Sequence, residues 1–408
     1  MTFKINSLCL TGEGIAQSTA GPLYAPFSLP DEQVSGTLTG NRITELRITT
    51  PSEHRVKAPC PHFKSCGGCM LQHASDAFVA RWKGEVVEKA LRAQGVSCTQ
   101  LTVITSPPRT RRRATFAGRR GKKGAMVGFH GRASGTIIPI PSCTLLHPGI
   151  MAALPAMVAL TVIGASRKAP ISLAITQSPA GPDIAVSGAK DADGPIMAEL
   201  GHLVESYKLA RLSWNGEVIA MRARPVQTFD AIPVTPPPGA FLQATEAGQS
   251  ALIDTVRAAV GPADRIVDLF AGCGTFSLPL AKQAQVLAVE GDADLLDALD
   301  AGWRSARGLK PLKTNKRDLF RNPLLPEELS PYAAAIIDPP RAGAKAQCQA
   351  LAQSNVPRIA YVSCNPVTFA RDAKILTGAG FTLEWVQPID QFRWSTHVEL
   401  VAAFVQVK

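Results

Sequence analysis

The 408-residue sequence lacks a long uninterrupted hydrophobic run and any recognisable export signal. Its most apolar stretch, residues 150–165, is shorter than the roughly 20 residues that a membrane-spanning helix needs, and Pro155 interrupts it. The first ten residues contain no apolar core followed by a small-residue cleavage site. We therefore expect a cytoplasmic protein without a membrane partner, in which residues 150–165 form a buried helix.

The composition excludes several non-globular classes of protein. Hydrophobic residues make up 46% and charged residues 18% of the chain, which excludes intrinsic disorder, collagen-like repeats and a coiled coil. The net charge of +11 favours polyanionic partners such as nucleic acid, although charge alone says nothing about fold.

The nine cysteines indicate a metal site rather than disulfides, because a chain without an export signal stays in a reducing compartment. Cys60, Cys66 and Cys69 follow a C-x5-C-x2-C spacing, and Cys143 could complete a four-thiolate site once the intervening chain folds back. Four thiolates hold either zinc or an iron–sulfur cluster, and the spacing does not choose between them.

Three regions are predicted along the chain. Residues 1–57 contain short alternating runs separated by turn signals, which is typical of a small OB-like β-barrel. Residues 58–237 hold the cysteines, an amphipathic helix at 78–94 and a basic stretch, and form a central α+β domain that ends in a proline-rich linker at 232–238. Residues 238–408 alternate between strands and helices, which predicts a doubly wound α/β sheet with one terminal antiparallel strand.

A glycine-rich loop follows the first strand of the last region. Residues 266–270 run into Ala271-Gly272-Cys273-Gly274-Thr275, whose glycines allow a tight turn and the close approach of a ligand. Glu290 ends the next strand, where a carboxylate can accept hydrogen bonds from both hydroxyls of a ribose. The loop has neither the lysine of a phosphate-binding loop nor the third glycine of a dinucleotide fingerprint, so S-adenosylmethionine is the favoured cofactor.

Two later strands end in residues that can do chemistry. Asp338 follows an apolar strand at 333–337, and Cys364 follows another at 358–362. Ligands of open α/β sheets bind at the carboxyl edge of the strands, so both side chains are expected on one rim. A helix that starts beside Cys364 could stabilise its thiolate, although a buried, inert cysteine is the alternative. Glu399, at the start of the last strand, is a candidate base.

These residue types suit methylation of uracil at C5. The C5 carbon is too weak a nucleophile to attack a sulfonium methyl group directly, so a thiolate must first add at C6. After methyl transfer, a base must remove the C5 proton so that the thiolate can leave. The reaction therefore requires a cysteine, a carboxylate near the polar edge of the ring and a second base, and Cys364, Asp338 and Glu399 supply them.

With these motifs the chain resembles the RNA uracil-C5 methyltransferases, specifically their iron–sulfur-containing branch, which acts on 23S ribosomal RNA. The resemblance covers essentially the whole chain and rests on five segments: residues 60–69, 268–274, 338–343, 363–366 and 397–399. It implies a Rossmann-like domain that binds S-adenosylmethionine, an N-terminal TRAM domain, and a [4Fe-4S] cluster held by the four cysteines Cys60, Cys66, Cys69 and Cys143.

The resemblance also implies a role for each site residue. Cys364 would be the nucleophile and Glu399 the proton-abstracting base, and Asp338 would hold the uracil edge. The residues expected to contact S-adenosylmethionine are Gln243, Phe270, Thr275, Glu290, Asp318 and Asp338. The family often has asparagine where Thr275 stands.

Residues 109–123 contain eight cations and no acid. The cations are Arg109, Arg111, Arg112, Arg113, Arg119, Arg120, Lys122 and Lys123. With Phe116 and Phe129 beside it, this run predicts a surface that follows RNA phosphates, although a merely solvated face is the alternative. The choice of base would then come from a flipped nucleotide at the catalytic rim.

Other functions remain open at this point. The same chemistry on transfer RNA needs the same residues, although members devoted to transfer RNA commonly lack the barrel and the cysteine cluster. A cytosine-C5 enzyme would place a cysteine where Arg341 stands. A non-catalytic iron–sulfur or zinc RNA-binding protein and a redox protein are the alternatives from other classes. No protein partner is implied.

Overall fold

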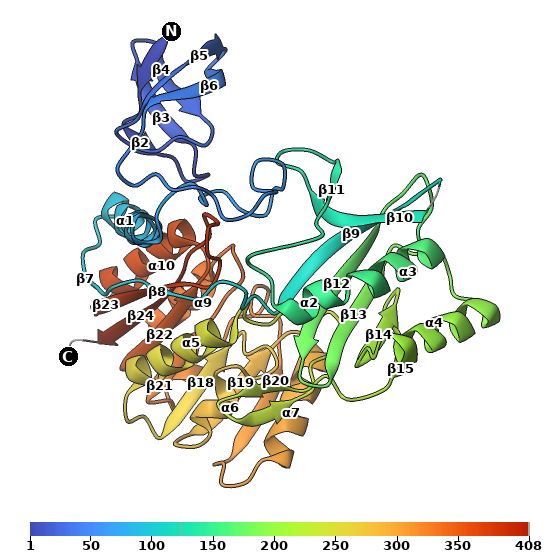
Figure 1. The fold of residues 1–408 in the computed structure, drawn as a ribbon. Helices are drawn as coiled ribbons and strands as arrows, with labels where there is room; N and C mark the ends of the chain where they lie inside the picture. The colour runs from blue at the N-terminus through green and yellow to red at the C-terminus, as the bar shows by residue number, and fades with distance from the viewer. Residues whose placement is uncertain (123, 407–408) are drawn as a thin grey trace.

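The computed structural model describes residues 1–122 and 124–406, which form three large β-sheets and a two-stranded hairpin (Figure 1). Lys123 of the basic run lies outside the described residues. The N-terminal sheet is drawn in blue and stands apart from the other two. Because helices accompany two of these sheets, the fold class is mixed α/β.

The N-terminal sheet has six strands in the order β1-β5-β6-β4-β3-β2. They are β1 (Thr2–Lys4), β2 (Ser7–Leu8), β3 (Gly14–Ser18), β4 (Gly21–Ala25), β5 (Gln33–Thr39) and β6 (Arg42–Thr50). Ile5, Val34 and Ile43 are buried in its small core. Alternation of apolar and polar residues explains most of these strands, but β3 gave no clear signal because it begins with glycine and ends in polar residues.

The second sheet has seven strands in the order β11-β10-β9-β12-β13-β14-β15. They are β9 (Arg113–Gly121), β10 (Gly124–His130), β11 (Ile137–Pro139), β12 (Ile171–Ser178), β13 (Gly181–Ser187), β14 (Arg211–Trp214) and β15 (Glu217–Met221). Three helices accompany it: α2 (Pro148–Ala152), α3 (Leu154–Gly164) and α4 (Gly194–Ser206). The apolar stretch at 150–165 is thus two helices that meet at Ala153, and Met157 and Leu160 of α3 are fully buried. No helix in the described part of the chain is long and apolar enough to cross a membrane.

The third sheet has the order β20-β19-β18-β21-β22-β24-β23-β7, in which β7 is Thr99–Gln100, and β8 (Ile104–Thr105) also pairs with β23. Its parallel strands are β18 (Arg265–Leu269), β19 (Gln285–Glu290), β20 (Leu312–Lys316), β21 (Ala334–Ile337) and β22 (Arg358–Ser363). The final strands β23 (Phe381–Asp390) and β24 (Glu399–Gln406) pair with each other, and β24 also runs antiparallel to β22, as the sequence predicted.

Both faces of this sheet are buried by helices, so its strands are apolar on both sides. The helices are α5 (Glu246–Val260), α6 (Ser277–Leu280), α7 (Ala293–Ser305), α8 (Pro326–Leu329), α9 (Lys345–Ala352) and α10 (Pro366–Gly378). Neighbouring residues of β21 show the alternation: Ile336 packs into the core on one face and Ile337 into the core on the other.

A segment assigned by sequence to the middle region packs against this third sheet. Helix α1 (Asp76–Ala93) lies against α10, and its Val87 and Leu91 belong to the core on that face. The short strands β7 (Thr99–Gln100) and β8 (Ile104–Thr105) then extend the sheet beside β23. Residues 76–105 therefore cover one end of the C-terminal region.

The interpretation of residues 232–238 as a linker is wrong for its first part. Strands β16 (Gln227–Phe229) and β17 (Ile232–Val234) form a hairpin, and Ile232 and Val234 are buried in the core of the third sheet. Pro233 points outward in this two-stranded sheet, where a missing backbone donor is tolerated. The prolines obscured an ordinary alternation of buried and exposed positions.

Candidate active site

The loop after β18 turns through three residues in the left-handed region of backbone conformation. Phe270 has φ +65°, Gly272 has φ +55° and Gly274 has φ +95°. A Cβ atom at Gly274 would lie only 2.9 Å from the side chain of Leu299, so glycine is required there for space as well as for conformation. Phe270 adopts this conformation without being glycine, which is typical of functional loops.

Glu290 at the end of β19 holds this loop in place. Its carboxylate accepts hydrogen bonds from the backbone nitrogen of Gly272 at 3.0 Å and from that of Gly291 at 2.7 Å. The rings of Phe270 and Phe320 lie 5.3 Å apart, and the Asp318 carboxylate accepts a hydrogen bond from the Phe320 nitrogen at 3.0 Å. Carboxylates and aromatic rings thus surround the space above the glycine loop.

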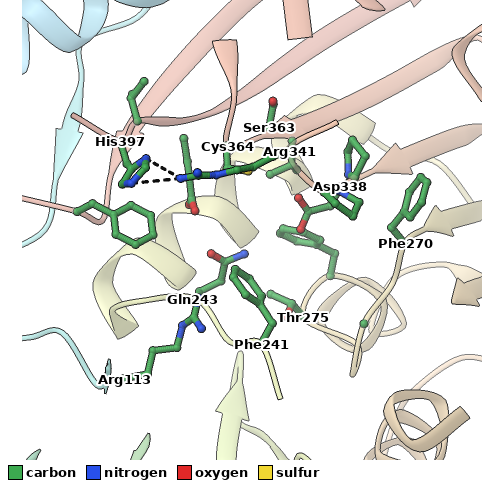
Figure 2. A pocket seen from close by; sticks show the side chains of 18 of the residues that line it. Arg113, Phe241, Gln243, Phe270, Thr275, Asp338, Arg341, Ser363, Cys364 and His397 are labelled. Carbon is green, nitrogen blue, oxygen red and sulfur yellow. Dashed lines mark hydrogen bonds between the residues drawn. The ribbon is translucent and has the colours of Figure 1, made fainter. Parts of the chain in front are cut away.

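A cavity of about 1110 Å³ opens at the carboxyl ends of these strands. All eight residues predicted from the sequence as catalytic or cofactor-binding line it. They are Gln243, Phe270, Thr275, Glu290, Asp318, Asp338, Cys364 and Glu399. Figure 2 shows Asp338 and Cys364 side by side above Thr275 and Gln243. Residues from the cysteine segment, Gly67, Gly68 and Met70, also belong to the cavity wall.

Cys364 directly follows β22 and is partly buried. Burial and the nearby carboxylates of Glu399 and Asp338 raise the pKa of the Cys364 thiol, whereas Arg341 acts in the opposite direction. Helix α10 begins at Pro366, two residues after Cys364, and a backbone hydrogen bond at Cys364 lowers the pKa of the thiol, but burial outweighs this effect. Asn365 caps α10 through its own side chain, which accepts a hydrogen bond from the Val367 nitrogen at 3.1 Å, and Cys364 lies outside the helix.

The two acids of the site bind protons more tightly than free carboxylic acids do. Burial raises the pKa of Glu399 to about 7, although Gln391 donates a hydrogen bond to its carboxylate. Burial, together with Glu399 and Asp268, raises the pKa of Asp338 well above its usual value. Because their negative charges would repel one another, the ionisation of any one of these two acids and the thiol disfavours ionisation of the others.

Sequence reasoning missed several residues that line the cavity. Arg341 and His397 form a hydrogen bond, with the Arg341 Nη2 atom 2.8 Å from the His397 Nδ1 atom (Figure 2). Burial and Arg341 lower the pKa of His397, so the neutral ring accepts this bond. The guanidinium of Arg113 lies 4.0 Å from the centre of the Phe241 ring, which is 61% exposed. Arg341 and His397 both lie inside motifs that the sequence had singled out.

The predicted basic run divides into three parts with different environments. Arg111 and Arg113 line the cavity. Arg112 is buried, and its guanidinium donates to the Gln243 carbonyl at 3.1 Å and to Gln249 at 2.7 Å. Arg119 and Arg120 are exposed near the end of the hairpin formed by β9 and β10.

The two aromatic residues expected beside this run differ in exposure. Phe116 is almost completely buried, and its ring stacks on that of Phe129 at a distance of 4.4 Å. The side chain of Phe116 lies in the core of the second sheet. The prediction of an RNA-binding ring is therefore wrong for Phe116, whereas Phe129 is partly exposed and lines the smaller cavity described below.

The four cysteines predicted to ligate metal line one smaller cavity of about 280 Å³. Burial and the neighbouring thiols raise the pKa of Cys69 to about 12. Within residues 1–122 and 124–406, no group of three or more His, Cys, Asp or Glu side chains is arranged to hold a single metal ion. Arg111 and Gly68 line this cavity and the larger one, so the two share a wall.

Comparison with known proteins places the chain in a family. Residues 305–406 match the family model described as tRNA (Uracil-5-)-methyltransferase. An uncharacterized RNA methyltransferase of Rhizobium meliloti (strain 1021) is 43% identical, and the match covers 98% of each chain. The 23S rRNA (uracil(1939)-C(5))-methyltransferase RlmD of Shewanella sp. (strain MR-7) is 30% identical, covering 100% of this chain and 96% of the relative.

A solved structure has the same fold over nearly the full length. The tRNA (uracil-54, C5)-methyltransferase of Pyrococcus abyssi, in complex with S-adenosyl-L-homocysteine, superposes with a TM-score of 0.77 at 20% identity and covers 99% of both chains. The full-length relatives, the family model and the cavity at the strand ends agree with one another. The chain belongs to the RNA uracil-C5 methyltransferase family, whose members are S-adenosylmethionine-dependent enzymes that act on RNA.

Proposed function

We propose that this enzyme transfers a methyl group from S-adenosylmethionine to C5 of a uridine in 23S ribosomal RNA, through a covalent bond between Cys364 and C6 of the base. The 30% identity to RlmD over the whole chain supports ribosomal RNA. The fold does not separate this substrate from transfer RNA, because a transfer-RNA enzyme covers 99% of the chain. The presence of the N-terminal sheet therefore does not distinguish a ribosomal-RNA enzyme from a transfer-RNA enzyme.

The observation that carries the proposal is the single cavity that contains Cys364, Asp338 and Glu399 beside the glycine loop. Its volume of about 1110 Å³ leaves room for a nucleoside cofactor and a flipped base together. Glu290, Asp318 and the glycine loop suit the adenosine part of S-adenosylmethionine. That cofactor supplies a methyl group on a positively charged sulfur.

The residues of the chain then have distinct roles. Cys364 is only partly buried, so its proton can pass to water, and the thiolate attacks C6 of the uracil. The electron pair of the C5–C6 double bond moves toward the O4 carbonyl. Burial raises the pKa of Asp338 and so favours its protonated form, which donates a hydrogen bond to that carbonyl as it gains negative charge. C5 thereby becomes nucleophilic and would take the methyl group from the sulfonium, and S-adenosyl-L-homocysteine would be the leaving group.

Glu399 completes the reaction. Its carboxylate removes the proton from C5, the electron pair of that C–H bond re-forms the C5–C6 double bond, and the bond between C6 and the Cys364 sulfur breaks. A pKa of about 7 leaves much of Glu399 ionised at neutral pH while making it a stronger base than a solvent-exposed glutamate. Burial of this acid is therefore suited to proton abstraction.

We also propose a [4Fe-4S] cluster bound by Cys60, Cys66, Cys69 and Cys143. Each thiolate around a single zinc ion lies about 2.3 Å from the metal, which brings the sulfurs close together. The thiolates of a polynuclear cluster lie farther apart, and four cysteines around one cavity of about 280 Å³ fit that larger group. The methyl transfer involves no net oxidation or reduction, so the role proposed for the cluster is to stabilise the structure or to position the RNA.

The proposed domains keep the boundaries derived from the sequence. Residues 1–57 are a TRAM-like OB barrel, residues 58–237 are the central iron–sulfur and RNA-binding domain, and residues 238–408 are the methyltransferase domain. The six-stranded and seven-stranded sheets support the first two of these proposals, although α1, β7 and β8 pack against the third.

Covalent trapping with RNA that contains 5-fluorouridine tests the proposal, because fluorine at C5 cannot be removed by a base. The wild-type enzyme and the control Cys98→Ala, altered at a cysteine outside both cavities, are expected to form an adduct that survives denaturing gels. Cys364→Ala is expected to bind S-adenosylmethionine without forming an adduct. An adduct with Cys364→Ala would overturn the assignment of the nucleophile.

The RNA substrate needs a separate measurement. C5-methyluridine would be mapped in ribosomal and transfer RNA from cells with and without the gene. Loss of one methylated position in 23S ribosomal RNA is expected, and a loss confined to transfer RNA would overturn the proposed substrate. No loss in either RNA would favour a binding protein without catalytic activity.

A further inference from the structure

The side-chain amide of Gln391 connects three parts of the active site. Gln391 follows β23 directly and is fully buried. Its Nε2 atom donates hydrogen bonds to the Gln243 Oε1 atom at 2.7 Å and to the Glu399 carboxylate. Its Oε1 atom accepts a hydrogen bond from the Thr245 backbone nitrogen at 3.3 Å. A carboxylate can only accept and a backbone nitrogen can only donate, so these partners fix the orientation of the amide.

The surrounding structure leaves room for this amide and restricts its movement. A Cβ atom at Gly248 would lie 2.2 Å from the Cγ atom of Gln391, so α5 can approach this closely only because position 248 is glycine. The preceding residue, Asp390, is bound to the buried Lys83 at 2.6 Å. The ion pair at Asp390 therefore restrains the backbone before Gln391, and the close packing of α5 restrains its side chain.

Two consequences follow for the reacting groups. The bond to Gln391 occupies the Oε1 atom of Gln243, which leaves the Nε2 atom as a donor on the side of the cavity where Asp338 lies (Figure 2). The bond to Glu399 engages only the Oε2 atom of that carboxylate. The Oε1 atom of Glu399 thus remains available to receive a proton.

We propose that Gln391 is a positioning residue for methyl transfer, which orients Glu399 as the base and Gln243 as a donor to bound ligand through one amide group. The inference rests on the proposed function, because it requires Glu399 to remove the C5 proton. Gln391 does not line the cavity, so it acts on the cofactor and the uracil only through Glu399 and Gln243.

The charge on Glu399 depends on several neighbours besides Gln391. Five titratable or charged groups interact electrostatically with Glu399, and each lies on a different helix or strand or at its end. They are Lys83, Arg113, Asp338, Cys364 and Asp390. Gln391 is the hydrogen-bond donor among the groups that act on Glu399, and a donor favours the ionised form. Removing it is expected to raise the pKa of Glu399, so that the low-pH limb of the rate profile moves to higher pH.

The test compares Gln391→Met with Gln387→Met across pH 5.5 to 9 in steady-state formation of free methylated RNA, which requires Glu399 to remove the C5 proton. Gln387 is a matched control, since it is buried on β23, four residues before Gln391, but donates to the carbonyls of Thr102 and Pro388 at 2.6 and 2.9 Å, away from the cavity. Gln391→Met is expected to move the low-pH limb upward by about one pH unit and to raise KM for S-adenosylmethionine several-fold. Gln387→Met is expected to leave both unchanged.

A second variant keeps the test decisive if Gln391→Met does not fold. Gln391→Glu conserves shape but places a second carboxyl against Glu399, and the pair would share one proton at neutral pH, which also moves the limb upward. If either Gln391→Met or Gln391→Glu folds and its low-pH limb of the rate profile stays at the wild-type pH, the proposed role of Gln391 is overturned. Failure of the proposed function is distinguishable, because Glu399→Gln would then turn over normally.

Discussion

Lys83 on α1 and Asp390 at the end of β23 form a buried ion pair, with the Lys83 Nζ atom 2.6 Å from the Asp390 carboxylate. The Lys83 Nζ atom also donates to the Phe392 carbonyl at 3.1 Å. Asp390 lies nine residues before Glu399 in the sequence and directly before Gln391. This ion pair therefore joins the helix that covers the end of the sheet to the strand end that carries the active site.

Removing one partner of this pair is expected to be costly. Lys83→Met leaves an uncompensated carboxylate in the core and is expected to lower the free energy of unfolding by about 3–5 kcal/mol. Lys89→Met, at an exposed position of the same helix, is expected to change it by less than about 0.5 kcal/mol. Urea denaturation followed by circular dichroism checks both values, and equal effects would contradict a structural role for the pair.

Glu399→Gln is expected to stall the reaction after methyl transfer. An amide cannot accept the C5 proton, so RNA should accumulate in covalent linkage to Cys364, visible as a slower band on a denaturing gel. Glu384→Gln, on the exposed side of β23, serves as the control and should turn over normally. Full turnover by Glu399→Gln would remove this residue from the mechanism.

Asp268 is expected to make stability depend on pH. Burial raises its pKa to about 7, and Ser277 donates a hydrogen bond to it at 2.5 Å. Between about pH 4 and pH 7 the folded protein holds a proton that the unfolded chain has released, so the free energy of unfolding falls as pH rises through this range.

Asp268→Asn is expected to flatten that dependence, because asparagine does not titrate. Glu399 contributes a slope of the same sign, so some dependence should remain. Urea titrations at pH 5 and pH 7 measure the difference. A slope identical to that of the wild type would show that Asp268 is ionised in the folded protein.

The exposed arginines of the β9–β10 hairpin are expected to contribute affinity for RNA without base specificity. Replacing Arg119 and Arg120 by alanine should weaken binding to all RNA sequences alike. The slope of log K against log salt should fall by about 0.7 to 0.9 for each phosphate that the protein no longer neutralises. Arg112→Ala should instead destabilise the fold, because that side chain is buried among glutamines. Filter binding at several salt concentrations distinguishes the two effects.

Anaerobically purified protein is expected to be brown and to contain about four iron atoms per chain. Cys66→Ser should lose most of the iron and the visible absorbance, whereas Cys98→Ser, outside the cysteine cavity, should keep both. Metal analysis and absorption spectra provide the readout. Stoichiometric zinc without iron would contradict the proposed cluster.

The position of the site was predictable because it depends on the ends of parallel strands. The runs before Asp338 and Cys364 are almost entirely apolar, which identifies β21 and β22, and topology then places their carboxyl ends at one edge. Glu399 was predictable by motif alone. The structure adds that it opens the antiparallel strand beside β22, close enough to raise the pKa of Cys364.

Other features depend on contacts that no local pattern encodes. Strands β7 and β8 have two residues each, too few to show a period, and they pair with residues 385–390 far along the chain. Arg111, Arg112 and Arg113 look alike in sequence, but an extended backbone sends successive side chains in opposite directions. Gln391 gave no signal, because a buried glutamine is recognised only by its partners.

Arg111 and Gly68 separate the cysteine cavity from the larger one, and two backbone nitrogens just beyond the cysteines, those of Met70 and Leu71, donate to the Trp394 carbonyl at 2.7 and 2.9 Å. The chain that surrounds the thiols is therefore also part of the enclosure in which the RNA base would react. Oxidative damage to those sulfurs would distort that enclosure. A protein kept in air is therefore expected to bind its RNA substrate less tightly, even if Cys364 and Glu399 are chemically intact.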